Sequence, residues 1–294
     1  MSLRGREAPQ GLADFAGLLR RHGVHPDKRL GQHFLFDPAA LHKVVAAAGL
    51  QGDETVLEVG AGVGSLTCRL GAAAGHVLAV EIDRRLIPAL EEAVAGFANV
   101  EILQCDVLSL DLETLVGRRP YLVVANIPYQ ITSQLIRWLL EAPRPPRALV
   151  LTIQREVAER IVAQAGEMSL LALSVQLYGS PRVMDRIPAG AFTPPPNVDS
   201  AILRVDVFAE PRVPSDRIAG VFLLARLGFN QKRKQLRNAL SGGLHVPAQE
   251  IAAWLAEAGL QPQARAQELR WEDWSRLAEG VRRRQGLPVV LPSG

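Results

Sequence analysis

The sequence is poor in cysteine and has no long apolar run. Its two cysteines, Cys68 and Cys105, form no Cys-x-x-Cys pair and have no histidine cluster nearby, so we expect reduced thiols and no metal site. No stretch of about 18 apolar residues could form a membrane-spanning helix. The N-terminus, MSLRGREAPQ, also lacks the apolar core of a secretory signal. These absences predict a cytoplasmic protein without a membrane partner.

Size and composition favour a folded protein with one large domain and one smaller one. The 294 residues are 48% hydrophobic, which is enough to bury a substantial core. The net charge of +3 is by itself a weak sign of an anionic partner. Its distribution says more, because the densest basic clusters lie in the last third of the chain: Lys232, Arg233, Lys234 and Arg237, then Arg282, Arg283 and Arg284.

From Glu54 onward, short apolar runs alternate with helical segments, which is typical of βαβ units and predicts a parallel sheet. Five strands are expected within residues 55–60, 76–83, 99–107, 121–129 and 147–154. Helices are expected over residues 12–21 and 37–48 ahead of the sheet, and over 65–74 and 84–95 within it. The predicted fold class is therefore α/β, a Rossmann-like sheet with helices on both faces.

A proline-rich loop, AFTPPPNVDS at 191–200, lies between two runs that are predicted as late strands, LALSVQLYG at 171–179 and SAILRVDVF at 200–208. Three consecutive prolines are incompatible with a helix or a central strand. Late antiparallel strands that close a parallel sheet suit a Rossmann-like domain of the methyltransferase type. The pattern turns helical near residues 210–214. We therefore predict an N-terminal extension over 1–27, an α/β domain over 28–210 and a smaller all-helical domain over 211–294.

The segment EVGAGVG at 58–64 follows a predicted strand and precedes a predicted helix. Gly60, Gly62 and Gly64 allow a tight turn there and let a ligand touch the backbone. Glu81, at the end of the second strand, can accept hydrogen bonds from both hydroxyls of a ribose. The spacing is GxGxG rather than the GxGxxG of dinucleotide sites, so a ligand without a pyrophosphate is favoured.

Two further acids follow the predicted strands. Asp106, at the end of the third strand, is placed to accept a hydrogen bond from an adenine amine. Asp83 is expected to cap the following helix rather than to contact a ligand. The alternative is that the glycines only turn the chain and that the acids are solvated.

The tetrapeptide Asn126–Ile127–Pro128–Tyr129 ends the fourth strand, where open α/β sheets bind their ligands. The exocyclic nitrogen of adenine is a poor nucleophile, because its lone pair is delocalised into the ring. Hydrogen bonds from that amine to the Asn126 side-chain oxygen and the Ile127 carbonyl would draw the nitrogen toward tetrahedral geometry. Pro128 stiffens the turn, and Tyr129 can stack on a base that has left its helix. A strand-end turn with a core aromatic is the alternative.

Seven motifs, spread in order over about residues 28–280, give the chain a family resemblance. They are KRLGQHFL at 28–35, EVGAGVGSLT at 58–67, VEID at 80–83, CD at 105–106, NIPY at 126–129, FTPPPNVDS at 192–200 and GFNQKRKQLRNAL at 228–240. With these motifs the chain resembles the ribosomal RNA adenine dimethyltransferase family, of the KsgA type. The resemblance implies S-adenosyl-L-methionine as cofactor and dimethylation of two adjacent adenines in a hairpin near the 3′ end of small-subunit ribosomal RNA, with a role in maturation of the small subunit.

The resemblance also implies roles for single residues. It places Gln32, His33 and Leu35 over the cofactor, Gly60 and Gly62 beneath its methionine part, Glu81 at its ribose and Asp106 at its adenine, and it sets Asn126 between cofactor and target. Phe192 would face Tyr129 and help to clamp the target adenine. His33 stands where many relatives have asparagine, which puts a side-chain contact at that position in doubt.

RNA binding is expected of Lys232, Arg233, Lys234 and Arg237, whose spacing could lay several cations along one helical segment. A solvated basic face is the alternative. Two other functions remain open: an adenine methyltransferase that acts on large-subunit ribosomal RNA, as in antibiotic resistance, and an assembly factor that acts mainly through RNA binding. The expected partner is an immature small ribosomal subunit, and nothing in the sequence demands a dimer, so a monomer is expected.

Overall fold

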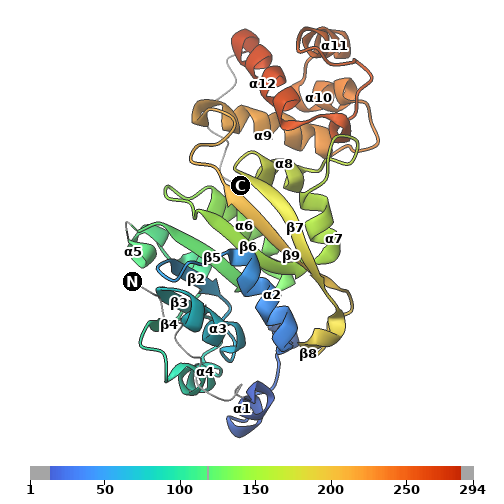
Figure 1. Cartoon of the computed structure of the whole chain (residues 1–294). Helices are drawn as coiled ribbons and strands as arrows, with labels where there is room; N and C mark the ends of the chain where they lie inside the picture. The colour runs from blue at the N-terminus through green and yellow to red at the C-terminus, as the bar shows by residue number, and fades with distance from the viewer. Residues whose placement is uncertain (1–13, 118, 286–294) are drawn as a thin grey trace. The chain divides into compact units, whose positions relative to one another are not determined.

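The computed structural model describes residues 14–117 and 119–285 (Figure 1). The predicted helix at 12–21 and the outer ends of the predicted extension and helical domain therefore lie partly outside the described residues. The helices are α1 Phe15–Arg21, α2 Pro38–Ala48, α3 Ser65–Ala73, α4 Ile87–Val94, α5 Leu112–Val116, α6 Thr132–Leu140, α7 Arg155–Ile161, α8 Leu170–Gln176, α9 Ser215–Phe229, α10 Leu236–Leu244, α11 Ala248–Glu257 and α12 Trp271–Gln285.

Most of the strands join one seven-stranded sheet in the order β4-β3-β2-β5-β6-β9-β7. Their bounds are β2 Thr55–Val59, β3 His76–Glu81, β4 Val100–Gln104, β5 Tyr121–Asn126, β6 Ala148–Gln154, β7 Gly179–Ile187 and β9 Ser200–Val207. The strands from β2 to β6 pair in parallel, and β9 runs antiparallel to β6. The predicted α/β fold with a late antiparallel strand is confirmed.

The order of the strands reverses beside β2. The chain runs outward from β2 through β3 to β4, then returns to the other side of β2 with β5 and continues to β6. The loops after β2 and β5 therefore separate at the same edge of the sheet. In open α/β sheets such a switch point is where ligands bind.

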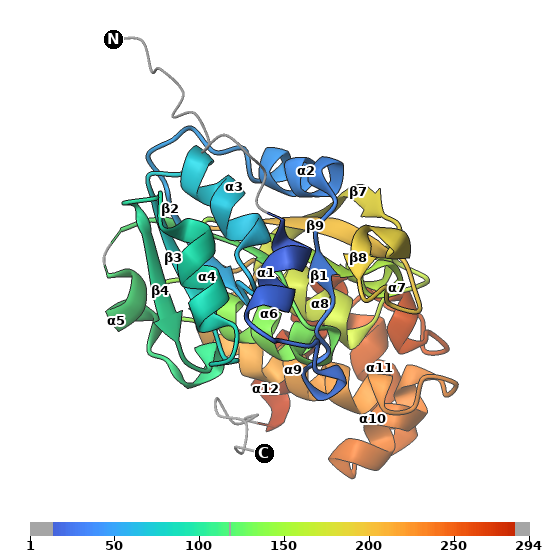
Figure 2. The same ribbon diagram turned by 90° about the horizontal axis from the view of Figure 1, so that it is seen from below.

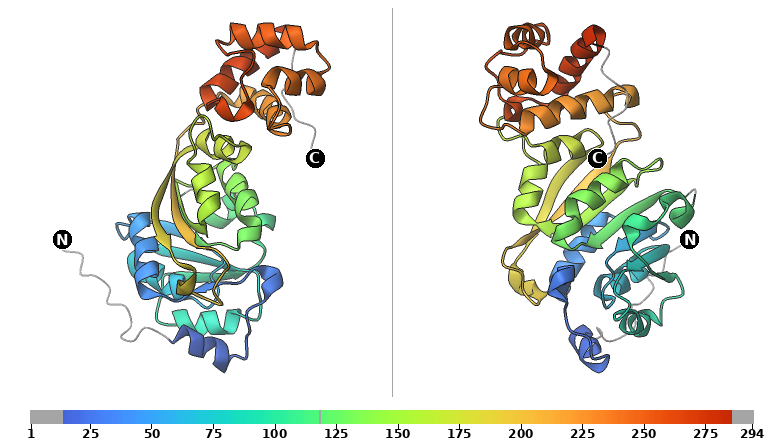
Figure 3. Two further views of the ribbon diagram at one scale, coloured as in Figure 1. Left: turned by 90° about the vertical axis from the view of Figure 1, so that its right-hand side faces the viewer. Right: turned by 180° about the vertical axis from the view of Figure 1, so that it is seen from behind.

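Helices cover both faces of the sheet (Figure 3). On one face, α2 and α3 bury apolar side chains of the strands, including Val56 of β2, Val124 of β5 and Ile202 of β9. Helix α4 extends this layer over Ala79 of β3. On the opposite face lies α6, whose Leu135, Ile136 and Leu139 are fully buried. Burial of each such side chain contributes about 1.5–3 kcal/mol, so these helices fix the strand ends that carry the site.

Helix α1 packs beside α4 (Figure 2). Asp14 caps it by accepting a hydrogen bond from the Gly17 amide, and Phe15, Leu18 and Leu19 are buried in a cluster with Val63 of the glycine loop. Part of the predicted N-terminal extension therefore supports this loop from outside.

A short two-stranded sheet links two motifs that are far apart in the sequence. Strand β1, Phe34–Leu35, pairs antiparallel with β8, Phe192–Thr193. The Ser65 hydroxyl at the start of α3 donates to the Leu35 carbonyl at 2.8 Å. The segment before α2 is thus held against both the proline-rich loop and the sheet.

The described chain divides into two compact units, residues 14–158 with 181–207 and residues 159–180 with 208–285. The division predicted near residue 210 assigned 159–180 to the α/β domain, whereas the structure places these residues in the helical unit. Part of the reason is that the prediction of a strand at LALSVQLYG is wrong, because most of this segment forms the helix α8. Ser169 accepts a hydrogen bond from the Ala172 amide at its start, and Leu173 and Val175 are buried.

Candidate active site

A cavity of about 340 Å³ lies in the first unit, where the strand order reverses. Its volume is in the range of small-molecule sites. Five segments supply most of its lining, and each contains or adjoins a predicted site residue: residues 29–35, 58–62, 80–82, 105–108 and 126–131. Ser65, Leu66 and Leu86 complete the lining. We call residues 29–35 the cover segment. Every predicted cofactor residue lines this cavity, as do Ile127, Pro128 and Tyr129.

The glycine loop takes a backbone path that side chains resist. Gly60 and Gly62 have φ values of 76° and 62°, in the left-handed region that glycine favours. A Cβ on Gly62 would also lie 3.2 Å from the ring of Phe34 in the cover segment. The loop can therefore approach this segment closely only because residue 62 has no side chain.

Glu81 is buried at the end of β3 and holds the glycine loop in place. Its Oε2 accepts the Gly62 amide at 2.7 Å, and its Oε1 accepts the Asp83 amide at 2.8 Å. Burial raises the pKa of Glu81, and these two backbone donors oppose the rise. Each carboxylate oxygen has a second lone pair, so both can still accept a hydroxyl hydrogen.

Glu58 is a second buried acid in the cavity wall, and sequence analysis missed it. Only 1% of the residue is exposed, and among the described residues its Oε2 has no hydrogen-bond partner. Burial raises its pKa to about 8. The signal was available, because a glutamate inside the predicted buried strand TVLEV is unusual: glutamate is rarely fully buried unless it is paired.

Asp106 follows β4 and is exposed at the mouth of the cavity. Its Oδ1 accepts the Leu108 amide at 3.0 Å, which starts the short 3-10 helix Val107–Ser109. This bond fixes the carboxylate and leaves Oδ2 as the acceptor for a ligand.

At the end of β5, Asn126 faces the cover segment. Its Nδ2 donates to the backbone oxygen of His33 at 3.0 Å, which leaves Oδ1 as the accepting atom. The backbone oxygen of Asn126 lies 3.7 Å from the position of a Cβ on Gly60, so the two loops run side by side. Ile127 is buried, and Pro128 leads into the 3-10 helix Tyr129–Ile131.

Tyr129 is fixed at both its ring and its hydroxyl. The hydroxyl lies 2.8 Å from the Ser200 hydroxyl at the start of β9. The His33 ring stacks on the Tyr129 ring, with a distance of 5.9 Å between the ring centroids and an angle of 23° between the ring planes. The His33 Nδ1 lies 2.8 Å from the Pro194 carbonyl, so a side chain joins the cover segment to the proline-rich loop.

The expected arrangement of Phe192 opposite Tyr129 is not what the structure has. Phe192 is 3% exposed and packs in the core with Leu35 and Leu41, and it is not one of the residues that line the cavity. The cause is β8, whose register places Phe192 directly opposite Leu35. In this structure His33 provides the ring beside Tyr129.

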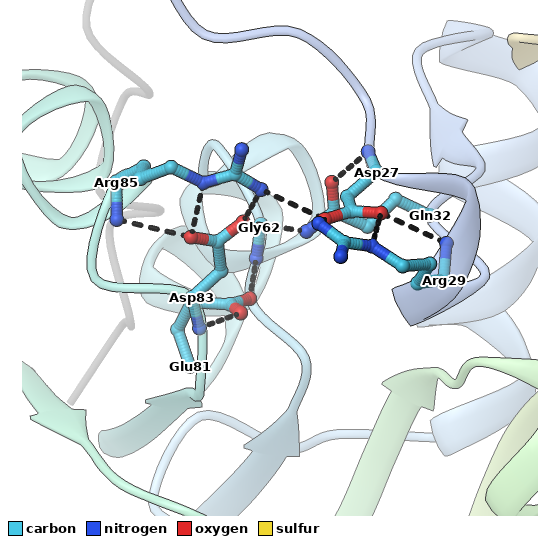
Figure 4. A network of polar contacts seen from close by, with 7 residues as sticks. All are labelled: Asp27, Arg29, Gln32, Gly62, Glu81, Asp83 and Arg85. Atoms are coloured by element: carbon cyan, nitrogen blue, oxygen red, sulfur yellow. Dashed lines mark hydrogen bonds and ion pairs between the residues drawn. The ribbon is translucent and has the colours of Figure 1, made fainter.

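The prediction that Asp83 caps α4 is wrong. Leu86 is at the N-cap of that helix. Instead the Asp83 carboxylate accepts two hydrogen bonds from the Arg85 guanidinium and one from the Gln32 side chain in the cover segment (Figure 4). Its pKa falls to about 2, mainly through the hydrogen bond from Arg85.

The predicted RNA-binding cations lie in the helical unit but not along one helix. Lys232, Arg233 and Lys234 are exposed in the turn between α9 and α10, and Arg237 lies half-buried in the first turn of α10. Helix α9 ends at Phe229, because the chain turns there to bring α10 against α9. The last basic run, Arg282 to Arg284, is ion-paired with Glu279 and Glu257.

The described residues hold no group of three or more histidine, cysteine, aspartate or glutamate side chains that could bind a metal ion. Both cysteines are free, and burial raises the pKa of the Cys68 thiol to about 12. Within the described residues no helix is long and apolar enough to cross a membrane.

The chain is similar to known proteins over nearly its whole length. Residues 25–282 match the family described as ribosomal RNA adenine dimethylase. Two curated relatives are both named ribosomal RNA small subunit methyltransferase A. The one from Dehalococcoides mccartyi (strain CBDB1) is 42% identical over 271 residues, which cover 92% of this chain and 93% of the relative. The one from Synechococcus sp. (strain RCC307) is 44% identical over 268 residues, 88% of this chain and 97% of the relative.

Two solved structures of RNA-modifying enzymes are also similar to this chain over most of its length. The 23S rRNA methyltransferase ErmE is 30% identical, with a TM-score of 0.69, and the match covers 84% of this chain and 98% of that one. A dimethyladenosine transferase from Plasmodium falciparum is 27% identical, with a TM-score of 0.71, over 83% of this chain and 96% of that one. The chain therefore belongs to the ribosomal RNA adenine dimethylase family of S-adenosylmethionine-dependent methyltransferases, which confirms the enzyme class and the cofactor expected from its sequence.

Proposed function

We propose that this enzyme dimethylates the exocyclic amines of two adjacent adenines in a hairpin near the 3′ end of small-subunit ribosomal RNA, as a step in the maturation of that subunit. Relatives that are 36–44% identical over about nine-tenths of the chain are named for the small subunit. The single observation that carries the chemistry is the position of Asn126. It lies in the cavity wall beside Gly60, with its amide nitrogen bound to the His33 carbonyl and its amide oxygen left to accept.

The residues present fit S-adenosylmethionine. Gly60 and Gly62 have no side chain, so a narrow ligand can occupy the space that a Cβ would fill. Glu81 has lone pairs left to accept hydrogen bonds from a ribose. Asp106 has an unused oxygen for the adenine amine. The cover segment, with Gln32, His33 and Leu35, lines the other side of the cavity.

The bound cofactor supplies an electrophilic methyl group on a sulfonium sulfur. In the first transfer Asn126 Oδ1 and the Ile127 carbonyl would accept the two hydrogens of the target amine, and in the second one of these acceptors would take the single hydrogen that remains. These bonds concentrate the nitrogen lone pair on the side of the methyl group. With the cofactor bound, its methyl group would pass to the amine nitrogen as the S–C bond breaks, and a neutral thioether would leave. The nitrogen then loses a proton to water, so no buried base is needed. Hydrogen bonds that act on the reacting nitrogen are worth most in the transition state.

Tyr129 holds the target adenine by stacking after the base has left its helix. Such a contact is worth roughly 1–3 kcal/mol per base. The Ser200 hydroxyl and the His33 ring keep the tyrosine in place for this role. Phe192 packs in the core beneath the site and does not contact the target adenine.

The exposed cations Lys232, Arg233 and Lys234, with Arg237, bind RNA phosphates through the helical unit. An immature small subunit is the partner, the enzyme acts as a monomer, and the reaction takes place in the cytoplasm. A large-subunit target is the second candidate, favoured by the 30% identity to the 23S rRNA methyltransferase ErmE. A role in subunit assembly through RNA binding alone is compatible with the first proposal.

One experiment separates these targets. Wild-type protein is incubated with labelled S-adenosylmethionine and either immature small subunits or large-subunit RNA, and the modified nucleotides are mapped. We expect label on two neighbouring adenines of the small-subunit RNA and none on the large-subunit RNA. Label on large-subunit RNA alone would favour the second candidate, and RNA binding without label would leave only the assembly role.

A further inference from the structure

The cover segment is fastened to the far side of the cavity by a polar network that none of the roles above uses (Figure 4). Two links cross between them. The Gln32 Nε2 donates to Asp83 Oδ2 at 2.9 Å, and Arg85 Nη2 lies 3.7 Å from Asp27 Oδ2. Asp27 stands just before the cover segment, while Asp83 and Arg85 follow β3. Contacts between residues 51 and 58 positions apart in the sequence thus close the cavity on this side.

We propose that Asp27, Asp83 and Arg85 are positioning residues that, with Gln32, form a latch on the cofactor, and that this latch controls how fast the cofactor and its product leave. The inference rests on the proposed function in two respects: it takes the cover segment to lie over the bound cofactor, and it takes the reaction to need repeated exchange of the cofactor. It adds residues and a task that the reaction itself does not require.

The geometry ranks the members of the latch. Asp83 is central, because its side chain is 5% exposed and accepts two hydrogen bonds from the Arg85 guanidinium as well as the one from Gln32. Charge-assisted bonds of this kind are about twice as strong as neutral ones. The Asp27–Arg85 pair is longer, and Arg85 is 48% exposed, so this second link is weaker.

Local bonds prepare both ends of the latch. The Asp27 amide donates to Gln32 Oε1 at 2.8 Å, which turns the Gln32 Nε2 toward Asp83. The Asp83 amide donates to Glu81, the proposed ribose-binding residue. Because that contact uses only the backbone, a substitution of the Asp83 side chain leaves it available. The latch can therefore be tested separately from the ribose contact.

Release of spent cofactor matters in this enzyme. Dimethylation of two adenines takes four methyl transfers, so S-adenosylhomocysteine must leave and fresh cofactor enter between them. A segment that closes over a ligand has to open at each exchange, and such steps often limit turnover. The latch bonds must break for the Gln32 end of the cover segment to open, whereas Phe34 and Leu35 at its other end are held by β8.

The test uses the full-length protein and S-adenosylhomocysteine as the probe. We expect Asp83→Ala to raise its Kd about tenfold, Arg85→Ala less, and Asp27→Asn least, with the loss appearing in the dissociation rate. The matched control is Arg84→Ala, which removes the same charge from the exposed neighbouring residue and should bind as wild type does. The rate constant of single-turnover methyl transfer at saturating cofactor should change less than about twofold in Arg85→Ala.

A second readout needs no ligand. Arg29 lies in the cover segment with 91% of its side chain exposed, so trypsin cleavage after Arg29 reports on opening. Arg85→Ala should be cut faster than Arg84→Ala. Gln32→Ala and Asp83→Ala both remove the Gln32–Asp83 hydrogen bond, so their effects on the Kd should be less than additive in the double variant.

Three results would overturn the latch: equal cleavage of Arg85→Ala and Arg84→Ala, equal Kd for the two variants, or a slower single-turnover transfer in Arg85→Ala without a change in Kd. If Asp83→Ala fails to fold, as judged by its melting temperature, Arg85→Ala decides. Failure of wild-type protein to bind S-adenosylhomocysteine would instead overturn the proposed function, and the cleavage comparison would still test the latch.

Discussion

The Asn126 side chain donates its amide hydrogen to the backbone oxygen of His33 at 3.0 Å, across 93 positions of sequence. This bond does two things at once. It turns Oδ1 of Asn126 to be the acceptor, and it ties the end of β5 to the cover segment. The residue that is proposed to activate the target amine is therefore oriented by the same segment that lies along the proposed cofactor site.

Replacement of Asn126 tests its catalytic role. Asn126→Ala should lower the rate of methyl transfer by about 100-fold or more, because a hydrogen bond made to the reacting nitrogen is lost. The Kd of S-adenosylhomocysteine should stay within about twofold of wild type, as measured by calorimetry. Asn238→Ala, at an exposed position of α10, serves as control. A parallel loss of cofactor affinity would mean that Asn126 acts through His33 instead.

Glu81 can be assigned to the ribose with an altered ligand. Glu81→Ala should weaken S-adenosylhomocysteine binding by about tenfold or more, since a buried acceptor is lost. An analogue without the ribose 2′-hydroxyl should bind wild type less tightly, and Glu81→Ala should not discriminate between the two ligands. If the variant still discriminates, the main role of Glu81 is to hold the Gly62 amide.

Glu58 should make stability depend on pH. Burial raises the pKa of Glu58 to about 8 in the folded protein, compared with about 4.5 in the unfolded chain. Between these two pH values Glu58 is protonated in the folded state and ionised in the unfolded state. The resulting stabilisation is complete below about pH 4.5 and is lost as the pH rises to about 8. Glutamine at position 58 cannot ionise. The free energy of unfolding of Glu58→Gln relative to wild type should therefore increase as the pH rises from about 4.5 to about 8, by at most about 1.4 kcal/mol for each unit of pKa shift.

Urea unfolding at several pH values measures this gain, and Glu54→Gln provides a control of opposite sign. Burial raises the pKa of Glu54, but the amides of Gln51 and Gly52 outweigh it and lower the pKa overall. Glu54 therefore stabilises the fold above its unfolded pKa, and its replacement should cost stability at neutral pH. A Glu58→Gln curve parallel to wild type at every pH would rule out a protonated Glu58 in the folded state.

The cations of the turn between α9 and α10 should set the salt dependence of RNA binding. Neutralising Lys232, Arg233 and Lys234 together should reduce the slope of log affinity against log salt by about 0.7–0.9 for each phosphate contact that is lost. Binding is measured at several salt concentrations with a small-subunit RNA fragment. Removal of the exposed charges at Arg84 and Arg119 should leave the slope unchanged. An unchanged slope in the triple variant would mean that these three cations are solvated and do not contact RNA phosphates.

Much of the candidate site could be predicted because its residues stand at the ends of strands. Gly60, Glu81, Asp106 and Asn126 each follow an apolar run, and parallel strands bring such positions to one edge of a sheet. All four line the cavity. Each of these four residues is marked by its neighbours in the sequence, so the fold class and these candidate site residues could be predicted from the sequence.

Long-range contacts were less accessible. The spacing of Leu, Ala and Val in 171–179 fits a strand as well as a helix, and the Ser169 cap together with packing against α9 decided for the helix. Phe192 could have faced the cavity or the core, and its pairing with Leu35 decided for the core.

What this sequence determined by itself is the order of strands and helices, the glycine turn and the polar residues at the strand ends, since each depends on neighbours a few positions away. Only the tertiary structure decided which of those polar groups meet. Asp83 accepts from Gln32 rather than capping α4, because packing brings the cover segment within 2.9 Å of it. A short polar side chain can satisfy its hydrogen bonds in several ways, and the choice among them rests with whichever distant segment the fold places beside it.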